Sequence, residues 1–234
     1  MLSRVTANTL TKKNQLLQQM IVLPIHTNPT TTQSSIMNVV GQNDDDEQTT
    51  KDLTLNISGL ENLGSDFVYE GWIIVDGSPI TTGRFSVNDT GNLSKTNFNL
   101  DISALEAAST FVLTIEPAVG DDPAPSNVHI LAGNFLGNSG QLSIEHGAAL
   151  ANNFSTVNGK YILATPTNGS NTDENSGVWF LDLASGAPAI GLSLPILPTG
   201  WKYEGWVVTD GIPVTSGKFS SASTFDEFDG FSIL

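Results

Sequence analysis

The chain of 234 residues contains no cysteine, so disulfide bonds, thiolate metal sites, iron–sulfur clusters and cysteine nucleophiles are all excluded. Charged side chains make up only 14% of the residues, whereas Gly, Asn, Ser and Thr are abundant. Solubility therefore comes from neutral polar groups, a profile more typical of extracellular β proteins than of helical cytosolic enzymes. We expect an extracellular or cell-envelope location, without a recognisable signal peptide.

Basic side chains are scarce. Nine Lys and Arg residues stand against 24 Asp and Glu residues, which gives a formal net charge of −15. Three of the nine lie within the first thirteen positions, so that 6 basic and 20 acidic residues remain from Lys51 onward. Binding to phosphate groups requires clusters of Lys and Arg. Nucleic acids and anionic membrane surfaces are therefore poor partners for the folded part.

Long apolar runs are also missing. The run at residues 20–25 is shorter than the core of a signal peptide and far shorter than the roughly 20 residues of a membrane-spanning helix. We expect no transmembrane segment, and a short amphipathic helix over residues 8–22. Residues 26–50 are polar and aperiodic, which is typical of a linker. The fold should therefore begin near Lys51, and deletion of residues 1–47 should leave the unfolding temperature almost unchanged.

An internal repeat gives the chain its organisation. Residues 69–86 return as residues 203–220, with eleven of eighteen positions identical at an offset of 134. A weaker similarity links residues 111–131 to residues 161–181. We call residues 69–86 block A, residues 111–131 block B, residues 161–181 block B′ and residues 203–220 block A′. Their order along the chain, A, B, B′ and A′, suggests two related half-units around a pseudo-twofold axis.

The repeat divides the chain into three regions. We expect an N-terminal arm or linker over residues 1–50, partly helical. A first β half-unit with blocks A and B should span residues 51–137, and a second with blocks B′ and A′ should span residues 138–234.

The residue pattern within these blocks predicts strands. Leu53, Leu55 and Ile57 alternate with polar residues, which marks a half-buried strand. Asp76-Gly77 between two β-rich runs is a hairpin signal. One short helix is expected behind Asp101, a suitable N-cap. The fold class predicted is all-β, an antiparallel β-sandwich with a pseudo-twofold internal repeat and one short helix.

The repeated hairpin, Tyr-Glu-Gly-Trp followed by Asp-Gly-x-Pro and Gly-x-Phe, resembles a hairpin of the anti-sigma-K factor C-terminal domain family. Block B, with Thr114-Ile115-Glu116-Pro117, resembles that family's Thr-x-Glu-Pro segment, and both occur in the family's order across residues 53–133. Block B′ departs from it, with Thr165-Pro166 in place of Glu-Pro. The second half therefore matches only through its hairpin A′.

The resemblance implies an extracytoplasmic β-sandwich, the outer half of a membrane-bound regulator. Such regulators also have a membrane helix and a cytoplasmic helical part that binds the sigma factor, and neither is visible in this sequence. The resemblance therefore implies a non-enzymatic interaction domain of the extracellular space or cell envelope, without the sigma-binding part and with a protein or glycan as its unknown partner.

The repeat also supplies the candidate binding residues: Tyr69, Glu70, Trp72, Tyr203, Glu204 and Trp206. Glu70 and Glu204 could serve a glycan hydrolase as its pair of carboxylates, with the aromatic residues stacking on sugar. Residues that recur in a repeat more often do the same structural work twice, for example by accepting backbone N–H bonds or by pairing with Arg84 and Lys218. In a strand, Tyr69 and Trp72 face opposite sides unless a bulge at Gly71 realigns them. We therefore favour a structural role for the two glutamates and core packing for one aromatic residue of each pair. A glycan hydrolase and a carbohydrate- or calcium-binding module are the alternatives.

Metal ligands are sparse. Weak calcium candidates are present in acidic loops: Asp121, Asp122, Asp173 and Glu174, and residues 44–47. No calcium-binding loop pattern surrounds them, so solvated acidic loops are the favoured interpretation. The three histidines, His26, His129 and His146, form no paired-ligand motif. We expect no catalytic residue, no metal and no cofactor.

Overall fold

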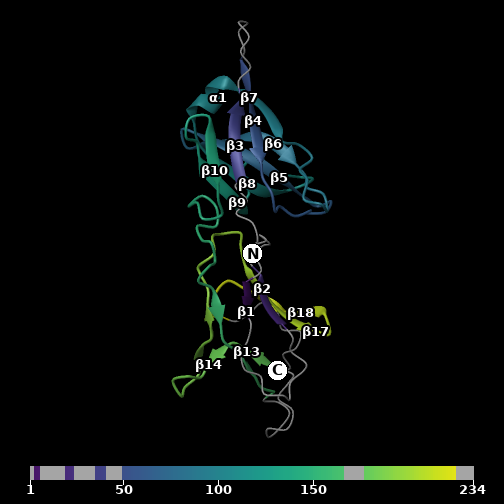
Figure 1. The fold of residues 1–234 in the computed structure, drawn as a ribbon, viewed down its shortest axis with the longest axis vertical. Helices are drawn as coiled ribbons and strands as arrows, with labels where there is room; N and C mark the ends of the chain where they lie inside the picture. The colour runs from purple at the N-terminus through teal and green to yellow at the C-terminus, as the bar shows by residue number, and fades with distance from the viewer. Residues whose placement is uncertain (1–2, 6–18, 24–34, 41–48, 166–176, 225–234) are drawn as a thin grey trace. The chain divides into compact units, whose positions relative to one another are not determined.

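The computed structural model describes residues 3–5, 19–23, 35–40, 49–165 and 177–224. Regular structure in these ranges is mostly antiparallel β-strand, with one short helix, α1 (Ile102–Ala107). The predicted all-β fold with a single short helix is thus confirmed for the described residues. Figure 1 shows the strands and the helix, coloured by residue number from the N-terminus to the C-terminus.

The chain forms two compact units. The central unit comprises the described residues of His26–Asn153 together with Pro198–Gly200. The terminal unit comprises those of Met1–Ile25, Phe154–Leu197 and Trp201–Leu234. These units do not follow the boundaries of the sequence repeat, because the central unit extends past residue 137 and the terminal unit draws on both ends of the chain.

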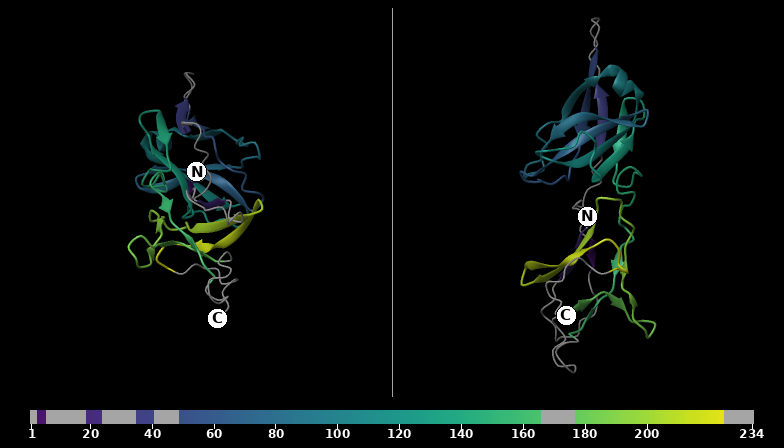
Figure 2. Two further views of the ribbon diagram at one scale, coloured as in Figure 1. Left: turned by 60° about the horizontal axis from the view of Figure 1, so that its bottom comes forward. Right: turned by 180° about the vertical axis from the view of Figure 1, so that it is seen from behind.

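The central unit is a sandwich of two four-stranded antiparallel sheets (Figures 1 and 2). The first has the order β10-β3-β4-β7, with bounds Ser139–Leu142, Ser35–Val40, Thr50–Asn56 and Asn97–Asp101. The second has the order β6-β5-β8-β9, with bounds Ser78–Phe85, Phe67–Val75, Ala108–Pro117 and His129–Asn134. Phe85 of the second sheet and Phe98 of the first have ring centroids 6.0 Å apart, so the two inner faces meet in one core.

Sequence periodicity accounts for the best-predicted elements of this unit. Leu53 and Leu55 on β4 are buried, whereas Asp52 before them and Asn56 after them are exposed, as the alternation predicts. Asp101 caps α1 by accepting a hydrogen bond from the backbone N–H of Ala104 at 3.0 Å. Both the strand and the N-cap were predicted from the sequence.

The second sheet is covered on both faces. On the face turned away from the sandwich core, Val112 of β8 and Ala132 of β9 pack with Ala149, against the half-buried Ile74 and Ala148. This explains why β5 and β8 have long buried stretches without alternation. Residues on both faces of β5 are therefore buried over positions 69–73.

Strand β3 corrects the prediction for the N-terminal fifty residues. It lies between β10 and β4, and its Met37 side chain is fully buried. The expectation of a linker over residues 26–50, with a fold that begins near Lys51, is therefore wrong for Ser35–Val40. The segment forms an inner strand of the sandwich. The sequence did not indicate it, because its six residues lie between polar stretches and are too few to show a clear periodicity.

In the terminal unit, hairpin A′ is part of a four-stranded sheet with the order β1-β2-β17-β18, with bounds Ser3–Val5, Gln19–Leu23, Tyr203–Thr209 and Ile212–Phe219. Gln19–Leu23 is a strand, so the predicted helix over residues 8–22 is wrong at its C-terminal end, and residues 8–18 lie outside the described residues. Because β2 pairs with β17, the N-terminal segment is not peripheral, contrary to our expectation for the deletion of residues 1–47.

The described residues of this unit also form three two-stranded ladders: β11 (Asn158–Gly159) with β16 (Leu192–Ser193), β12 (Ile162–Leu163) with β13 (Val178–Trp179), and β14 (Leu181–Asp182) with β15 (Ala189–Ile190). The predicted strands of block B′ are thus present in short form. Ile162 pairs with Trp179 and Leu163 with Val178.

Candidate functional site

The two copies of the repeated block fold as the same hairpin. In β5–β6, Tyr69 pairs with Phe85 and Gly71 with Gly83; in β17–β18, Tyr203 pairs with Phe219. The hairpin turns also agree, because Asp76 and Gly77 have φ of 50° and 77°, and the equivalent Asp-Gly pair has 52° and 80°. Positive φ at both positions is the requirement of a type I′ turn, which Asp-Gly satisfies. The predicted equivalence of blocks A and A′ is confirmed.

Each hairpin has a bulge at the same place. The register shifts between Gly71 and Trp72, where β6 carries the extra residue Thr82. The pairing of β5 with β8 has no shift there, so Tyr69 and Trp72 remain on opposite faces of β5. The expected bulge at Gly71 is present, but it does not bring the two rings to one face. Tyr69 and Trp72 are only 2% and 3% exposed because both faces of the sheet are covered.

Gly71 is required by this packing. A Cβ atom at this position would lie 2.9 Å from two ring carbons of Phe111 and closer still to the Thr82 hydroxyl. In the second hairpin, a Cβ atom on Gly205 would meet the hydroxyl of Ser216. The identity of glycine in both copies of the motif therefore has a steric cause.

The two tyrosines anchor the loops that precede their strands. The Tyr69 hydroxyl donates to the carbonyl of Glu61 at 2.9 Å and accepts from its N–H at 3.2 Å. The Tyr203 hydroxyl donates to the carbonyl of Pro195 at 2.6 Å. Their rings stack on Phe85 and Phe219, at 5.5 and 5.6 Å. Burial raises the pKa of both phenols to about 12.

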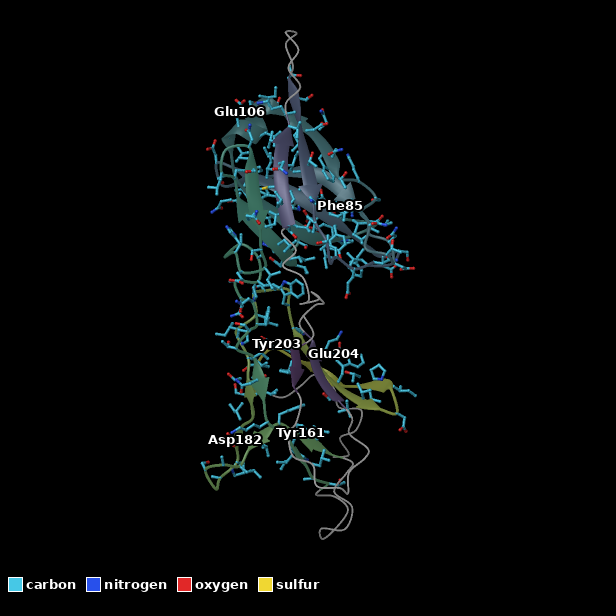
Figure 3. All side chains as sticks on the ribbon, viewed as in Figure 1. Phe85, Glu106, Tyr161, Asp182, Tyr203 and Glu204 are labelled. Carbon is cyan, nitrogen blue, oxygen red and sulfur yellow. The ribbon has the colours of Figure 1, made fainter. Side chains whose placement is uncertain are left out.

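Glu70 and Glu204 each have a threonine partner on the adjacent strand. The Thr81 hydroxyl donates to Glu70, and the Thr215 hydroxyl donates to Glu204 at 2.8 Å. Arg84 lies 3.5 Å from Glu70, which is only 7% exposed. Desolvation raises the pKa of Glu70, and this effect outweighs the hydrogen bond from Thr81 and the charge of Arg84. Tyr203 and Glu204, both on β17, are labelled in Figure 3.

Arg84 connects this carboxylate to the loop after β8. Its guanidinium lies 3.6 Å from Asp121 and donates to the carbonyl of Pro117. Glu70 is thus held within an ion-pair network that fixes the loop. Glu70 belongs to the central unit and Glu204 to the terminal unit, and each carboxylate is engaged inside its own unit.

The two tryptophans differ in their hydrogen bonding. Trp72 Nε1 donates to the Thr114 hydroxyl at 2.9 Å, whereas the buried Nε1 of Trp206 has no hydrogen-bond partner among the described residues. Trp72 is buried, so it offers no surface for stacking on a ligand. The structure therefore places Tyr69, Tyr203 and Trp72 in the core, and Trp206 is half-buried.

A polar cluster that we did not select as a site joins the Trp72 indole to the following loop. Thr114 and Glu116 are 0% and 1% exposed, and the Thr114 hydroxyl donates to Glu116. Glu116 also accepts from the backbone N–H of Ser126 at 2.9 Å. The Thr-x-Glu-Pro pattern of block B was the signal that could have identified this cluster. It orders the loop between β8 and β9 rather than opening a binding site.

The calcium candidates do not converge. Asp121 lies beside Arg84, and Asp122 accepts from the N–H of Ala124 at 2.9 Å. In the described part of the chain, no group of three His, Asp or Glu side chains is placed to hold a metal ion. Asp173, Glu174 and residues 44–47 lie outside the described residues, as does His26.

The two described histidines make local contacts. His129 Nδ1 lies 2.8 Å from the carbonyl of Ala148, and His146 Nε2 lies 3.2 Å from Oδ1 of Asn134. Both therefore fasten the segment that covers the outer face of the second sheet.

Comparison with known proteins identified no relative of this chain. No model of a protein family matches the chain, and no curated protein and no solved structure matches it either. Within the described residues, no helix combines the length and apolarity needed to cross a membrane.

Proposed function

We propose that the chain is a non-enzymatic interaction domain of the extracellular space or cell envelope, similar in role to the outer domain of anti-sigma-K factors and without their sigma-binding part. The observation that supports this most directly is the duplication of structural roles in the repeat. Tyr69 and Tyr203 make equivalent loop contacts, and Glu70 and Glu204 make equivalent threonine contacts. Because the polar groups of the motif make the same internal hydrogen bonds in both copies, we assign the motif to the fold. Recognition of a partner would then use exposed surfaces and strand edges.

One such surface is the outer face of the first sheet, where most side chains are uncharged and polar, with Asp52, Asp101, Ile36 and Val40 among them. Asn38 pairs across to Thr54, and the Thr54 hydroxyl donates to Oδ1 of Asn97 at 2.8 Å. In the next row, Asn99 donates to Asp52 at 2.9 Å. The outward-facing positions of these four strands include no Lys or Arg. This composition suits a partner bound through neutral hydrogen bonds, such as a protein or glycan, and not nucleic acid.

Cell fractionation of the native host tests the location. We expect the protein with the envelope or in the medium, detected by an antibody against the purified chain. Recovery in the cytoplasmic fraction, together with a cytoplasmic marker protein, would reject the proposal.

The hydrolase alternative is tested by turnover. We expect the purified protein to release no sugar from a panel of glycans. Hydrolysis that disappears in both Glu70→Gln and Glu204→Gln, with circular dichroism unchanged, would establish an enzyme instead.

A further inference from the structure

Strand β2 occupies in the terminal unit the position that β8 occupies in the central unit. Gly205 pairs with Val22 as Gly71 pairs with Leu113. The neighbouring pairs keep the same register, because Trp206 lies opposite Ile21 and Trp72 lies opposite Val112. Both neighbours run antiparallel to the hairpin strand, so hairpins A and A′ each accept one strand along the same edge.

The two accepted strands differ in origin. Strand β8 follows β5 and β6 within the central unit, whereas β2 precedes that whole unit in the chain. Hairpin A′ is therefore completed by a segment from the N-terminus. A two-stranded hairpin alone is marginal in water, and its open edge presents unpaired N–H and C=O groups that bind a further strand.

The two accepted strands also differ in fit. The residue opposite Glu70 is Thr114, and its hydroxyl accepts the hydrogen bond of Trp72 Nε1. The residue opposite Glu204 is Leu23, which has no hydroxyl. A buried donor without a partner is unfavourable. Trp206 Nε1 is such a donor, because it has no hydrogen-bond partner among the described residues. Strand β2 therefore pairs with β17 but provides no acceptor for the Trp206 indole N–H.

We infer that the edge of β17 is an acceptor site for an extended peptide of a partner protein, which replaces β2. The peptide runs antiparallel to β17 and carries Ser or Thr opposite Glu204, with apolar residues at the two preceding positions, as in Val112-Leu113-Thr114. Its backbone pairs with β17 as β2 does, and its hydroxyl accepts the hydrogen bond of Trp206. Recognition by strand addition takes affinity from the main chain and specificity from side chains at alternate positions. This inference names a partner class for the interaction function proposed above and rests on it.

The probe for this site is a synthetic peptide with the sequence of residues 108–117, compared with the same peptide bearing Thr114→Leu. Binding to the full chain is measured by calorimetry, and the indole N–H resonance of Trp206 is followed by NMR. We expect the threonine peptide to bind about 2- to 10-fold more tightly, the value of one added hydrogen bond. Equal affinity for the two peptides would overturn the inference.

Trp206→Phe and Trp72→Phe form a matched pair of protein variants. We expect Trp206→Phe to remove the preference for threonine and Trp72→Phe to leave it unchanged. A preference that survives Trp206→Phe contradicts the proposed contact.

Competition by β2 is controlled with a third variant, Ile21→Pro, which removes a backbone donor opposite Trp206 and weakens the resident strand. We expect this full-length variant to bind the threonine peptide more tightly than the unmodified chain does. If neither peptide bound the Ile21→Pro variant, the proposed peptide site on β17 would be rejected. The proposed location would not be affected, because it is tested separately by fractionation. A cytoplasmic location with preserved peptide binding would reject the proposed function and not the site.

Discussion

The hydroxyl of Tyr203 donates to the carbonyl of Pro195, eight residues earlier in the chain, and the hydroxyl of Tyr69 donates to the carbonyl of Glu61 over the same separation. The repeat therefore extends upstream of the block that sequence identity defines. Glu61 and Pro195 have unlike side chains, but the contact uses only their carbonyl oxygens. An equivalence carried by the backbone leaves no trace in a residue-by-residue comparison.

Removal of the Tyr69 hydroxyl is expected to destabilise the central unit. Tyr69→Phe keeps the ring that stacks on Phe85 but loses both hydrogen bonds to Glu61, at a cost of about 0.5–1.5 kcal/mol. Urea unfolding followed by tryptophan fluorescence measures this change. Tyr161→Phe, at a half-buried tyrosine outside the two repeated hairpins, is the control and should change the free energy of unfolding by less. Equal effects of the two substitutions would argue against the anchoring role.

The same phenol makes stability depend on pH in the alkaline range. The pKa of Tyr69 is raised from 10.0 to about 12 by burial, so the folded state favours the neutral phenol. The stabilisation is fully present below pH 10 and is lost as the pH rises towards about 12. We expect the difference in unfolding free energy between the unmodified protein and Tyr69→Phe to be constant below pH 10 and to shrink above it. A difference that stays constant up to pH 12 would contradict the raised pKa.

Arg84 is expected to matter more than its counterpart in the second hairpin. Arg84→Ala leaves the buried Glu70 without its cation and releases Asp121 and the Pro117 carbonyl. Because the guanidinium side chain is 36% exposed, solvent screening limits the cost to about 1–2 kcal/mol.

Lys218→Ala provides the matched control for Arg84→Ala. Lys218 lies opposite Glu204 but forms no ion pair with the described residues, so the pairing expected from the sequence is found for Arg84 and not for Lys218. We expect a change of about 0.5 kcal/mol or less in chemical denaturation. A cost as large as that of Arg84→Ala would show that the network around Glu70 contributes nothing specific.

Local signals in the sequence predicted the elements whose determinants are themselves local. The Asp-Gly turns, the alternation of Leu53 and Leu55 and the Asp101 cap each depend on residues within a few positions of one another. The placement of β2 and β3 depends on strands far along the chain, with β2 beside β17 and β3 between β10 and β4. Short apolar segments do not encode their partners, so sequence reasoning left both outside the fold.

The sequence showed which residues recur in the two hairpins, but not which contacts they make. The repeat singled out Tyr69, Glu70 and Trp72, and the structure gives equivalent contacts in the second hairpin to the first two only. It did not reveal Thr114 as the acceptor for Trp72, because that hydroxyl lies on a different strand, 42 residues later. The difference between Trp72 and Trp206 follows from that neighbouring strand and not from the repeated motif itself.

The strand that the sequence most clearly failed to identify offers a direct test. Met37 on β3 is 0% exposed between the two sheets, so Met37→Ala should leave a cavity and cost about 2–5 kcal/mol. Asn38→Ala, at the exposed next position of the same strand, should cost about 0.5 kcal/mol or less. Guanidinium unfolding of the two full-length variants measures both values. If residues 26–50 were a linker, neither substitution would change the midpoint, whereas an inner strand requires a large loss at Met37 alone.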